Sequence, residues 1–419
     1  MELLKKPVTG MKDILPDEMK LRDHVIHLAK ETYGRYGFLP MQTPCVEHIE
    51  NLSSNQGGEN EKLIFKIMKR GEKLDIAGAQ KENDLCDSGL RYDLTLPLSR
   101  YFANNQSKLP MPFKALQIGN VFRADRPQRG RFREFMQCDI DILGDPSPLA
   151  EVELINATAS LLSRLDFKDF KIRINDRRIL RAMASFCGFD EDQLPEVYII
   201  LDKMDKIGPE GVKKELMGAG LEEEKVENYT GLFEGEYGPA QTVHGLFERL
   251  NGSLSKEVSD DLIRIMEAAD AVKTNDYSIV FDPTLVRGMG YYTGTIFEIE
   301  MEEFKGSVAG GGRYDAMIGN FTGNPVPACG FSIGFERIIT ILTEKGYRVP
   351  EENEKTVFLV EKNMDGAGLS RIMKEAADLR GRGVTVLIVT MAKNKKFQKE
   401  TLSSQGYSSF REFFKEQDR

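Results

Sequence analysis

The sequence predicts an α+β fold, with an antiparallel sheet core, a helical insertion and a small C-terminal α/β domain. Strand-like segments are frequent within 88–145 and resume within 277–332, whereas the segment between them is rich in Glu and Lys and almost lacks strand patterns. Because the sheet pattern resumes after this helical block, the block is best explained as an insertion into the sheet domain.

We expect four regions along the chain. The first part of the core spans 1–175, the helical insertion 176–274, the second part of the core 275–350 and the C-terminal α/β domain 355–419. Pro350 and the acidic run EENEK mark the linker before the last region.

The N-terminal part of the core begins with a predicted amphipathic helix over 17–36. Leu21, Val25 and Ala29 fall on one face of this helix, and an extended stretch with two prolines, FLPMQTPCVEH, follows it. Three strand candidates come next within 88–145, namely GLRYDLTLP, FKALQIGNVF and EFMQCDIDILG.

The later elements continue this pattern. A helix, AEVELINATASLLSRL, precedes a strand, FKIRIN, and the insertion follows. Strands are then expected at 277–283, 291–300 and 326–332. The C-terminal region shows strand TVFLV, a helix over 367–381, strand VTVLIV and one more helix, and its pattern stops after two strands.

The composition of the 419 residues excludes several protein classes. A 41% hydrophobic and 29% charged chain is typical of globular proteins, and no apolar stretch is long enough for a membrane span. The start lacks the apolar region of a secretory signal, and the five scattered cysteines form no CxxC pair, so we expect a reduced, cytoplasmic protein. Four histidines make a His-rich metal site improbable, and the charge of −9 argues against indiscriminate nucleic-acid binding.

No common phosphate-binding loop is present, because GxxxxGK[ST] is absent and no GxGxxG precedes a helix. If the chain binds a nucleotide, arginines must take the place of such a loop. Residues 123–133, RADRPQRGRFR, contain five arginines between two predicted strands. An exposed basic loop is the alternative interpretation of this run.

The strand after this loop alternates between apolar and polar residues. The apolar positions are Met136, Cys138, Ile140 and Ile142, and the opposite positions are Phe135, Gln137, Asp139 and Asp141. A β-hairpin would therefore place arginines beside an aromatic ring and carboxylates. Guanidinium groups bind phosphate oxygens and an aromatic ring can stack on a base, so this hairpin is a candidate ATP site.

Two further segments carry candidate site residues. The stretch Arg91–Leu96 is predicted as an alternating strand with Arg91, Asp93 and Thr95 on one face, where a carboxylate and a hydroxyl could hold an ammonium group. The segment LVRGMGYYTG places Arg287 before two glycines and two tyrosines. Each segment also has a purely structural interpretation. The stretch 91–96 could be a solvated sheet face, and the two tyrosines could be core aromatics.

The segment GFSIGFERIITIL matches the GxSxG pattern of hydrolases but lacks a downstream histidine, so the hydrolase interpretation is poor. It is better explained as a Gly-rich turn that opens a helix. Arg337 then lies in an early turn of that helix, where the positive helix end adds to its attraction for phosphate.

Taken together, these segments resemble the class II aminoacyl-tRNA synthetases, and within them the histidyl-tRNA synthetase family. FRADRPQRGRFREFMQCDIDILG is similar to motif 2, GFSIGFERI to motif 3, and LVRGMGYYTG and AGGGRYD to the two histidine-specific signatures. Pro44 resembles the motif 1 proline at the dimer interface, and GMKDILP and LDKMDKIGPEGVKKEL also match. The resemblance covers about 1–345 with specific motifs and continues weakly to the end of the chain.

The resemblance implies a class II synthetase-like catalytic core that uses ATP and Mg²⁺, with no metal ligated by protein residues alone. Arg123 and Arg337 would hold the ATP phosphates, Phe135 would stack on adenine and Arg131 would reach the terminal phosphate. Arg287 would contact the α-phosphate and the histidine carboxylate, so Arg123, Arg287 and Arg337 are the expected catalytic residues.

The resemblance also implies a binding site for L-histidine. Its expected residues are Asp93, Thr95 and Gln137 for the α-amino group, Asp141 and Tyr292 for the imidazole, and Tyr291 as a pocket wall. The further expected partners are tRNA, which the helical insertion would touch, and a second copy of the chain in a homodimer. The region 355–419 is expected to be a truncated anticodon-binding-like α/β domain.

Two alternatives remain open at this level. The regulatory subunit of ATP phosphoribosyltransferase resembles the synthetase core and binds histidine without charging tRNA, and a synthetase paralogue could form the adenylate without charging tRNA. The retained arginines favour an enzyme. Gly290 departs from the family pattern, which commonly has an aspartate before the tyrosines.

Overall fold

The computed structural model describes residues 3–54, 60–233, 239–274, 276–287, 292–350 and 354–415. These residues form two compact units, one ending at Tyr347 and one beginning at Arg348. The helical and strand content and the large sheet of the first unit confirm the predicted α+β fold. The domain boundaries that we drew at 175/176 and 274/275, and the linker at 350–355, stay predictions.

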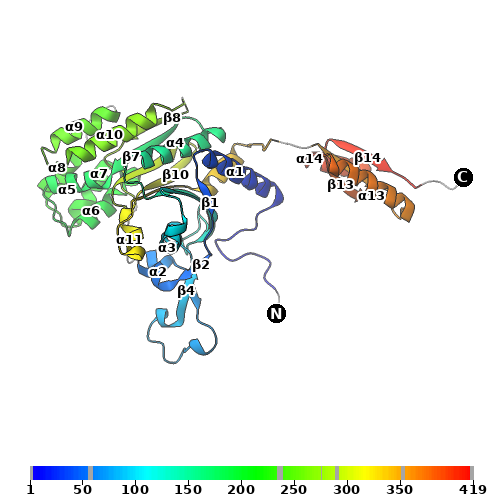
Figure 1. Ribbon diagram of the computed structural model, residues 1–419, viewed down its shortest axis with the longest axis horizontal. Helices are drawn as coiled ribbons and strands as arrows, with labels where there is room; N and C mark the ends of the chain where they lie inside the picture. Colours follow the sequence, from blue (N-terminus) through cyan, green and yellow to red (C-terminus); the bar gives the residue numbers. More distant parts are fainter. Residues whose placement is uncertain are drawn as a thin grey trace. The chain divides into compact units, whose positions relative to one another are not determined.

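An eight-stranded sheet forms the centre of the first unit (Figure 1). Its strands are, in spatial order, β1 Leu39–Met41, β5 Phe113–Phe122, β6 Glu134–Leu143, β11 Ala328–Ile333, β10 Phe304–Arg313, β9 Thr295–Met301, β7 Phe170–Asp176 and β8 Tyr277–Phe281. The five inner pairings are antiparallel, whereas the pairs β1–β5 and β7–β8 at the two edges are parallel. The order brings strands from both ends of the first unit together at its middle, where β6 lies beside β11.

Three helices pack against this sheet and against one another. Helix α1 Pro16–Arg35 contacts β5 and α4 Leu149–Arg164, which lies over β11, and α12 Phe335–Glu344 contacts β6 and β10. Helix α1 buries Leu21, Val25 and Ala29, as its predicted apolar face requires.

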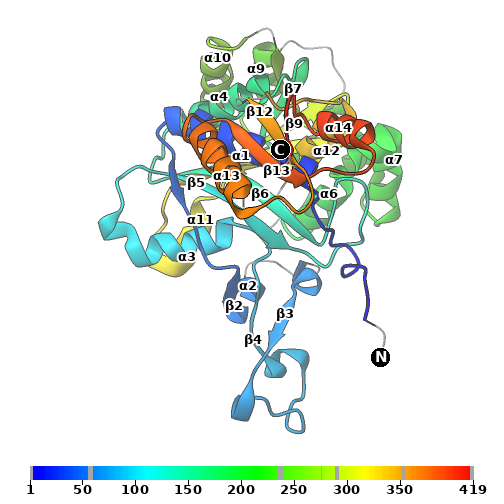
Figure 2. The ribbon, with the colours of Figure 1, turned by 90° about the vertical axis from the view of Figure 1, so that its right-hand side faces the viewer.

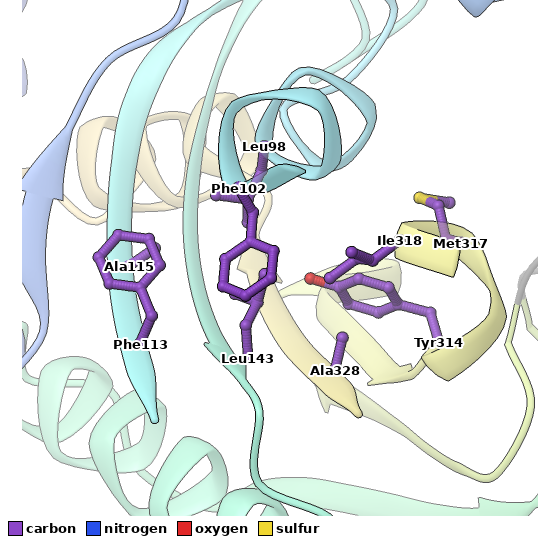
Figure 3. Packing of buried hydrophobic residues seen from close by; sticks show 9 residues of the cluster. All are labelled: Leu98, Phe102, Phe113, Ala115, Leu143, Tyr314, Met317, Ile318 and Ala328. Atoms are coloured by element: carbon purple, nitrogen blue, oxygen red, sulfur yellow. The ribbon is translucent and has the colours of Figure 1, made fainter. Parts of the chain in front are cut away.

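A second pair of helices, α3 Thr95–Asn105 and α11 Asp315–Thr322, packs together in contact with a compact apolar cluster. Figure 3 shows this cluster, in which Phe102 of α3 lies among side chains from β5, β6 and α11. Ala115 of the cluster pairs across the strands with Asp141, so both side chains are on the same face of the sheet. The cluster therefore closes one end of the face that carries Asp141.

Among the residues that the structure describes between β7 and β8, six helices gather at one side of the first unit (Figure 1). They are α5 Arg177–Phe186, α6 Leu194–Leu201, α7 Met204–Gly218, α8 Glu223–Gly231, α9 Pro239–Arg249 and α10 Lys256–Asp270. Helix α10 contacts α4, β7 and β8, which attaches the helical block to the sheet. Helix α7 is interrupted at Gly208, whose φ of 69° suits glycine.

A small antiparallel sheet, β2 Val46–His48, β4 Cys86–Leu90 and β3 Lys66–Met68, extends from the main body (Figure 2). Helix α2 Ile49–Ser54 and the 3-10 helices Asn60–Leu63, Gly71–Lys73 and Glu82–Leu85 lie in the same segment of the chain, and a further 3-10 helix, Gln106–Lys108, follows α3. The second unit contains β12 Lys355–Val360, α13 Gly366–Gly381, β13 Thr385–Thr390, α14 Lys395–Ser404 and β14 Ser409–Phe413. Its three strands are all parallel, in the order β13-β12-β14.

Three predictions about local structure were wrong. The expected strand 91–96 is a loop followed by α3, because Asp93 Oδ1 accepts a hydrogen bond of 3.1 Å from Leu96 N and so caps the helix. Strand β10 was not expected, because its three consecutive glycines are untypical of strands. The second unit has a third strand, β14, where the pattern was expected to stop after two.

Within the described ranges, none of the helices combines the length and the apolar character needed to cross a membrane.

Candidate active site

A cavity of about 490 Å³ opens over the middle of the large sheet. Its walls come from β6, β10, β11, the start of α12 and the loops before α3 and after β5. Ten of the eleven predicted site residues line it: Asp93, Thr95, Arg123, Arg131, Phe135, Gln137, Asp141, Arg287, Tyr292 and Arg337. The eleventh, Tyr291, lies outside the described residues, as does Gly290.

The floor of the cavity is a row of polar side chains from neighbouring strands. Asp139 of β6 stands directly between Gln117 of β5 and Ser332 of β11 in the strand register, and Gln137 donates a hydrogen bond of 3.2 Å from Nε2 to Ser332 Oγ. Gly330 leaves the space in which Asp141 lies, because a Cβ atom there would collide with the Asp141 carboxyl. The floor thus depends on one glycine and on the alternation of β6.

The floor contains several buried oxygen atoms that lack a hydrogen-bond partner among the described residues. They are Gln137 Oε1, Asp139 Oδ1 and Asp141 Oδ2. A buried acceptor without a donor costs about 1–3 kcal/mol, so three of them together indicate a place for a donor-rich ligand. An ammonium group or the N–H of an imidazole supplies such donors.

Burial raises the pKa of Asp141 to about 7, and the nearby Asp93 carboxyl adds to the increase, while a hydrogen bond from Tyr314 opposes it. Burial and the Asp141 carboxyl also raise the pKa of Asp139 well above its usual range. Clustered carboxyls with raised pKa values in a cavity are typical of functional sites. A positively charged ligand would favour their ionised forms.

The same cavity is also lined by arginines. Burial, together with repulsion from the nearby Arg131, Arg287 and Arg123, lowers the pKa of Arg337 to about 10. Four guanidinium groups that are far apart in the sequence therefore share one electrostatic environment. Such a group of cations is favourable only for an anion with several charges, such as a polyphosphate.

Arg287 lies across strand β10. Its Nη1 donates hydrogen bonds to Glu298 Oε2 at 2.6 Å and to Ser307 Oγ at 3.4 Å. A Cβ atom on Gly310 would lie only 2.7 Å from Arg287 Cζ, so this strand position must be glycine for the guanidinium to pass over it. Arg337 donates a hydrogen bond to the carbonyl oxygen of Ser307, so both arginines contact the same residue of β10.

Arg123 lies between two aromatic rings. Its Cζ is 4.2 Å from the ring centroid of Tyr92 and 5.2 Å from that of Phe135, and its Nε donates to Tyr92 O at 3.0 Å. These contacts fix the guanidinium beside Phe135, the ring for which base stacking was predicted. Arg91, by contrast, is buried away from the cavity and donates to the carbonyl oxygens of Asn120 and Thr43.

The arginine-rich loop is held by the N-terminal segment. Arg133 N donates a hydrogen bond of 2.7 Å to Gly10 O, and Arg133 O accepts one of 2.8 Å from Arg123 N. Lys12 Nζ lies 4.9 Å from the ring centroid of Phe132 in the same loop. Thus the GMKDILP segment supports the base of the loop that carries Arg123 and Arg131.

Sequence reasoning assigned no role to four residues that the structure brings into this site: Asp139, Ser332, Tyr314 and Glu298. Asp139 was identified on the polar face of its strand, which was the available signal. Tyr314 follows the glycines of AGGGRYD and Ser332 lies inside the hydrolase-like pattern, so neither drew a role of its own.

Among the described residues, no group of three or more His, Cys, Asp or Glu side chains could hold a metal ion. Mg²⁺ is commonly bound by substrate phosphates, waters and one or two carboxylates, so this site fits an ion that arrives with a nucleotide.

Comparison with known proteins identifies a family. The family model described as histidyl-tRNA synthetase matches residues 10–338. A protein of Leifsonia xyli named histidine–tRNA ligase is 42% identical in an alignment of 414 residues that covers 96% of this chain and 94% of that protein. The crystal structure of histidyl-tRNA synthetase from Nostoc sp. PCC 7120 matches with a TM-score of 0.80 and 26% identity, over 97% of this chain and 90% of that one.

The fold is shared more widely. A structure from Bacillus halodurans, titled as an ATP phosphoribosyltransferase regulatory subunit/histidyl-tRNA synthetase, matches with a TM-score of 0.77 over 98% of this chain and 99% of that one. At 19% identity this likeness concerns the fold alone.

Proposed function

The chain belongs to the histidyl-tRNA synthetase family, and from this premise we propose that its cavity joins L-histidine to ATP and that the product is transferred to tRNA. One observation carries the proposal: an arginine wall and a floor of hydrogen-bond acceptors face the same cavity. The wall suits a triphosphate and the floor suits the two N–H-bearing groups of histidine.

The first step is the attack of the histidine carboxylate on the α-phosphorus of ATP. A new P–O bond forms the adenylate, and the bond to pyrophosphate breaks. Two anionic groups must approach each other, so fixed cations are required to offset their repulsion and to stabilise the charge that develops. Arg287 is assigned to the reacting carboxylate and α-phosphate, with Arg123 and Arg337 on the phosphates and Arg131 at the terminal phosphate.

Glu298 accounts for how Arg287 is kept in place before the substrates bind. The carboxylate holds Nη1 at 2.6 Å and is itself 3.8 Å from Arg173, so the ion pair belongs to a small network. Such a preorganised guanidinium needs little rearrangement at the moment of reaction. Phe135, beside Arg123, is assigned to the adenine ring.

Asp93, Thr95 and Gln137 are assigned to the α-amino group of histidine, and Asp141 and Tyr292 to its imidazole. Asp93 and Thr95 lie at the start of α3, where the Asp93 cap fixes the backbone of both. Buried partners for both imidazole and ammonium would exclude amino acids without a ring nitrogen, since the floor oxygens would be left unpaired.

Mg²⁺ bound to the ATP phosphates would neutralise their charge and orient them.

The second step is the attack of a terminal hydroxyl of tRNA on the adenylate carbonyl, which releases AMP. In the second unit the basic run that begins α14 is partly neutralised, since Lys395 and Lys399 both pair with Glu412. We assign no anticodon contact to these lysines.

The protein is proposed to act as a homodimer, with Pro44 at the interface between the copies. Strand β1 is an edge of the large sheet, and the exposed apolar side chains of Leu39 and Val46 lie close to Pro44 in the chain. Exposed apolar groups along a sheet edge favour a protein partner. Sedimentation at several concentrations tests this assignment, and a monomer at micromolar concentration contradicts it.

Histidine-dependent exchange between ATP and labelled pyrophosphate tests the first step. We expect exchange with L-histidine and at least about 10⁴-fold less with amino acids that lack an imidazole. Aminoacylation of tRNA tests the second step. Exchange without aminoacylation would identify a paralogue without tRNA charging, and histidine binding without exchange would identify a regulatory subunit.

A further inference from the structure

The strand register places the acidic side chain of Asp139 beside the predicted amino-group site. No role has been assigned to this side chain so far. Asp139 is only 4% exposed and faces Ser332 across the sheet, and its Oδ1 has no hydrogen-bond partner among the described residues. Gln137 Nε2 donates to Ser332 Oγ at 3.2 Å. The hydrogen of the Ser332 hydroxyl is not used in that bond, so it is available to the facing carboxyl of Asp139.

The direction of these hydrogen bonds decides which end of the Gln137 amide faces the cavity. A serine hydroxyl has one hydrogen, so when that hydrogen is given to Asp139, Ser332 can only accept from its other neighbour. The other neighbour must then be the amide nitrogen of Gln137, and Gln137 Oε1 is left without a partner in the described part of the chain. A carboxylate at 139 therefore selects the orientation in which Gln137 presents an acceptor.

We propose that Asp139, acting through Ser332, is a positioning residue that keeps Gln137 Oε1 directed into the cavity to accept a hydrogen bond from the α-ammonium group of the substrate. The proposal rests on the proposed function, because it concerns the amino-group site for histidine. Without the relay, the amide could turn and direct its NH₂ group toward the ammonium, where two donors face each other.

Burial and the neighbouring Asp141 carboxyl raise the pKa of Asp139 well above its usual range, so in the empty floor they oppose the ionised form. A bound ammonium adds positive charge to the same floor and favours the carboxylate that the relay requires. The relay and the bound substrate therefore stabilise each other.

The test measures dissociation constants by calorimetry with three probes: L-histidine, L-histidinol, which keeps the ammonium and the ring, and imidazole-4-propionate, which lacks the ammonium. Ser332→Ala removes the relay. We expect it to weaken binding of L-histidine and L-histidinol at least about tenfold, the loss of one hydrogen bond to a charged group. Binding of imidazole-4-propionate and the KM for ATP should stay within twofold, and Ser332→Thr, which keeps the hydroxyl, should restore most of the affinity.

Asp139→Asn and the double variant separate the relay from a direct charge effect. If Asp139 acts through Ser332, Asp139→Asn weakens L-histidine binding strongly alone and much less in the Ser332→Ala background. Asp145→Asn is the matched control, because Asp145 pairs with Ser147 at 2.6 Å in another Ser–Asp contact outside the cavity. We expect no change in that control.

The outcomes are distinguishable. If Ser332→Ala keeps L-histidine binding within twofold, or weakens all three probes equally, the relay is refuted. A full effect of Asp139→Asn in the Ser332→Ala background would also refute it in favour of a direct contact. If the unmodified protein binds no L-histidine at all, the proposed function fails, independently of the relay.

Discussion

The hydroxyl group of Tyr314 donates a hydrogen bond of 2.6 Å to Asp141 Oδ1 on the floor of the cavity. Both side chains are buried, and the second carboxyl oxygen of Asp141 has no partner within the described ranges. One oxygen is therefore held by the protein and the other remains available to a ligand. Tyr314 belongs to the apolar cluster that contacts α3 and α11 (Figure 3), so the pair joins this cluster to the polar site.

The first prediction concerns pH and Asp141. With a pKa of about 7, this carboxyl is ionised above pH 7 and protonated below it. We expect the affinity for L-histidine to fall as pH decreases through 7, because the ionised acceptor is lost. Calorimetry between pH 5.5 and 8.5 measures this dependence, and Asp141→Asn should remove the component near pH 7. A pH-independent affinity above the titration of the ligand's own imidazole would contradict the assignment.

The same shift affects the stability of the free protein. Because the folded-state pKa is raised from 3.8 to about 7, the folded state binds more protons than the unfolded state between these values. The contribution of this group to the free energy of unfolding is therefore full below about pH 4 and declines as pH rises to 7. At pH 8, Asp141→Asn should raise the free energy of unfolding by at least about 1 kcal/mol, as measured by chemical denaturation. Destabilisation at pH 8 would contradict the raised pKa.

The second prediction concerns Arg287. Arg287→Ala should lower the rate of ATP–pyrophosphate exchange by at least about 100-fold, because it removes a fixed donor from the reacting phosphate and carboxylate. The fold should remain intact, since Glu298 keeps Arg173 as a neighbour. Arg287→Lys, which keeps the charge but not the fork of donors, should be intermediate. Normal exchange by Arg287→Ala would remove this residue from its assigned role.

The third prediction compares two arginines of the same loop. Arg131 lines the cavity, whereas Arg129 pairs with the exposed Glu344. Arg131→Ala should raise the KM for ATP about tenfold, since a charged hydrogen bond to phosphate is lost. Arg129→Ala serves as the matched control and should change the KM less than twofold, because exposed ion pairs contribute little. Equal effects of the two substitutions would show that only the charge of the loop matters.

The fourth prediction concerns the N-terminal support of this loop. Gly10 has a φ of 85°, and a Cβ atom there would lie 2.7 Å from Arg133 Cδ. Gly10→Ala should therefore loosen the loop and raise the KM for ATP several-fold, with the KM for histidine unchanged, at a cost of about 1–2 kcal/mol. Gly34→Ala is the control, because Gly34 lies in α1 with no atom near its Cβ position and no positive φ. Steady-state exchange kinetics measure both KM values.

Much of the site could be predicted because its signals are local. The alternation of β6 placed Phe135, Gln137, Asp139 and Asp141 on one face, and these residues do line the cavity together. The position of Arg337 in the first turn of α12 followed from the glycine before the helix. Convergence of the arginines depended on the motif order rather than on periodicity, since they come from separate parts of the chain.

The wrong predictions share a physical cause, which is that tertiary contacts override local patterns. Residues 91–96 alternate like a strand, but Asp93 caps a helix and the Arg91 guanidinium binds two backbone carbonyls. Gly310 and Gly312 lie under the side chains of Arg287 and Tyr292, so β10 has the composition of a loop. Strand β14 is a short edge strand after α14, and no apolar alternation marks it.

The glycines of β10 also bear on how this protein can diverge or be redesigned. The glycines at 310–312 cannot acquire side chains that would give new specificity there. An added Cβ would meet Arg287 at Gly310, the carbonyl oxygen of Gly330 at Gly311, and the carbonyl oxygen of Thr295 beside Tyr292 at Gly312. Mutational libraries aimed at a different amino acid should therefore leave 310–312 unchanged and vary the neighbouring strands. For the same reason, we expect amino-acid substitutions at 310–312 to be tolerated least during evolution.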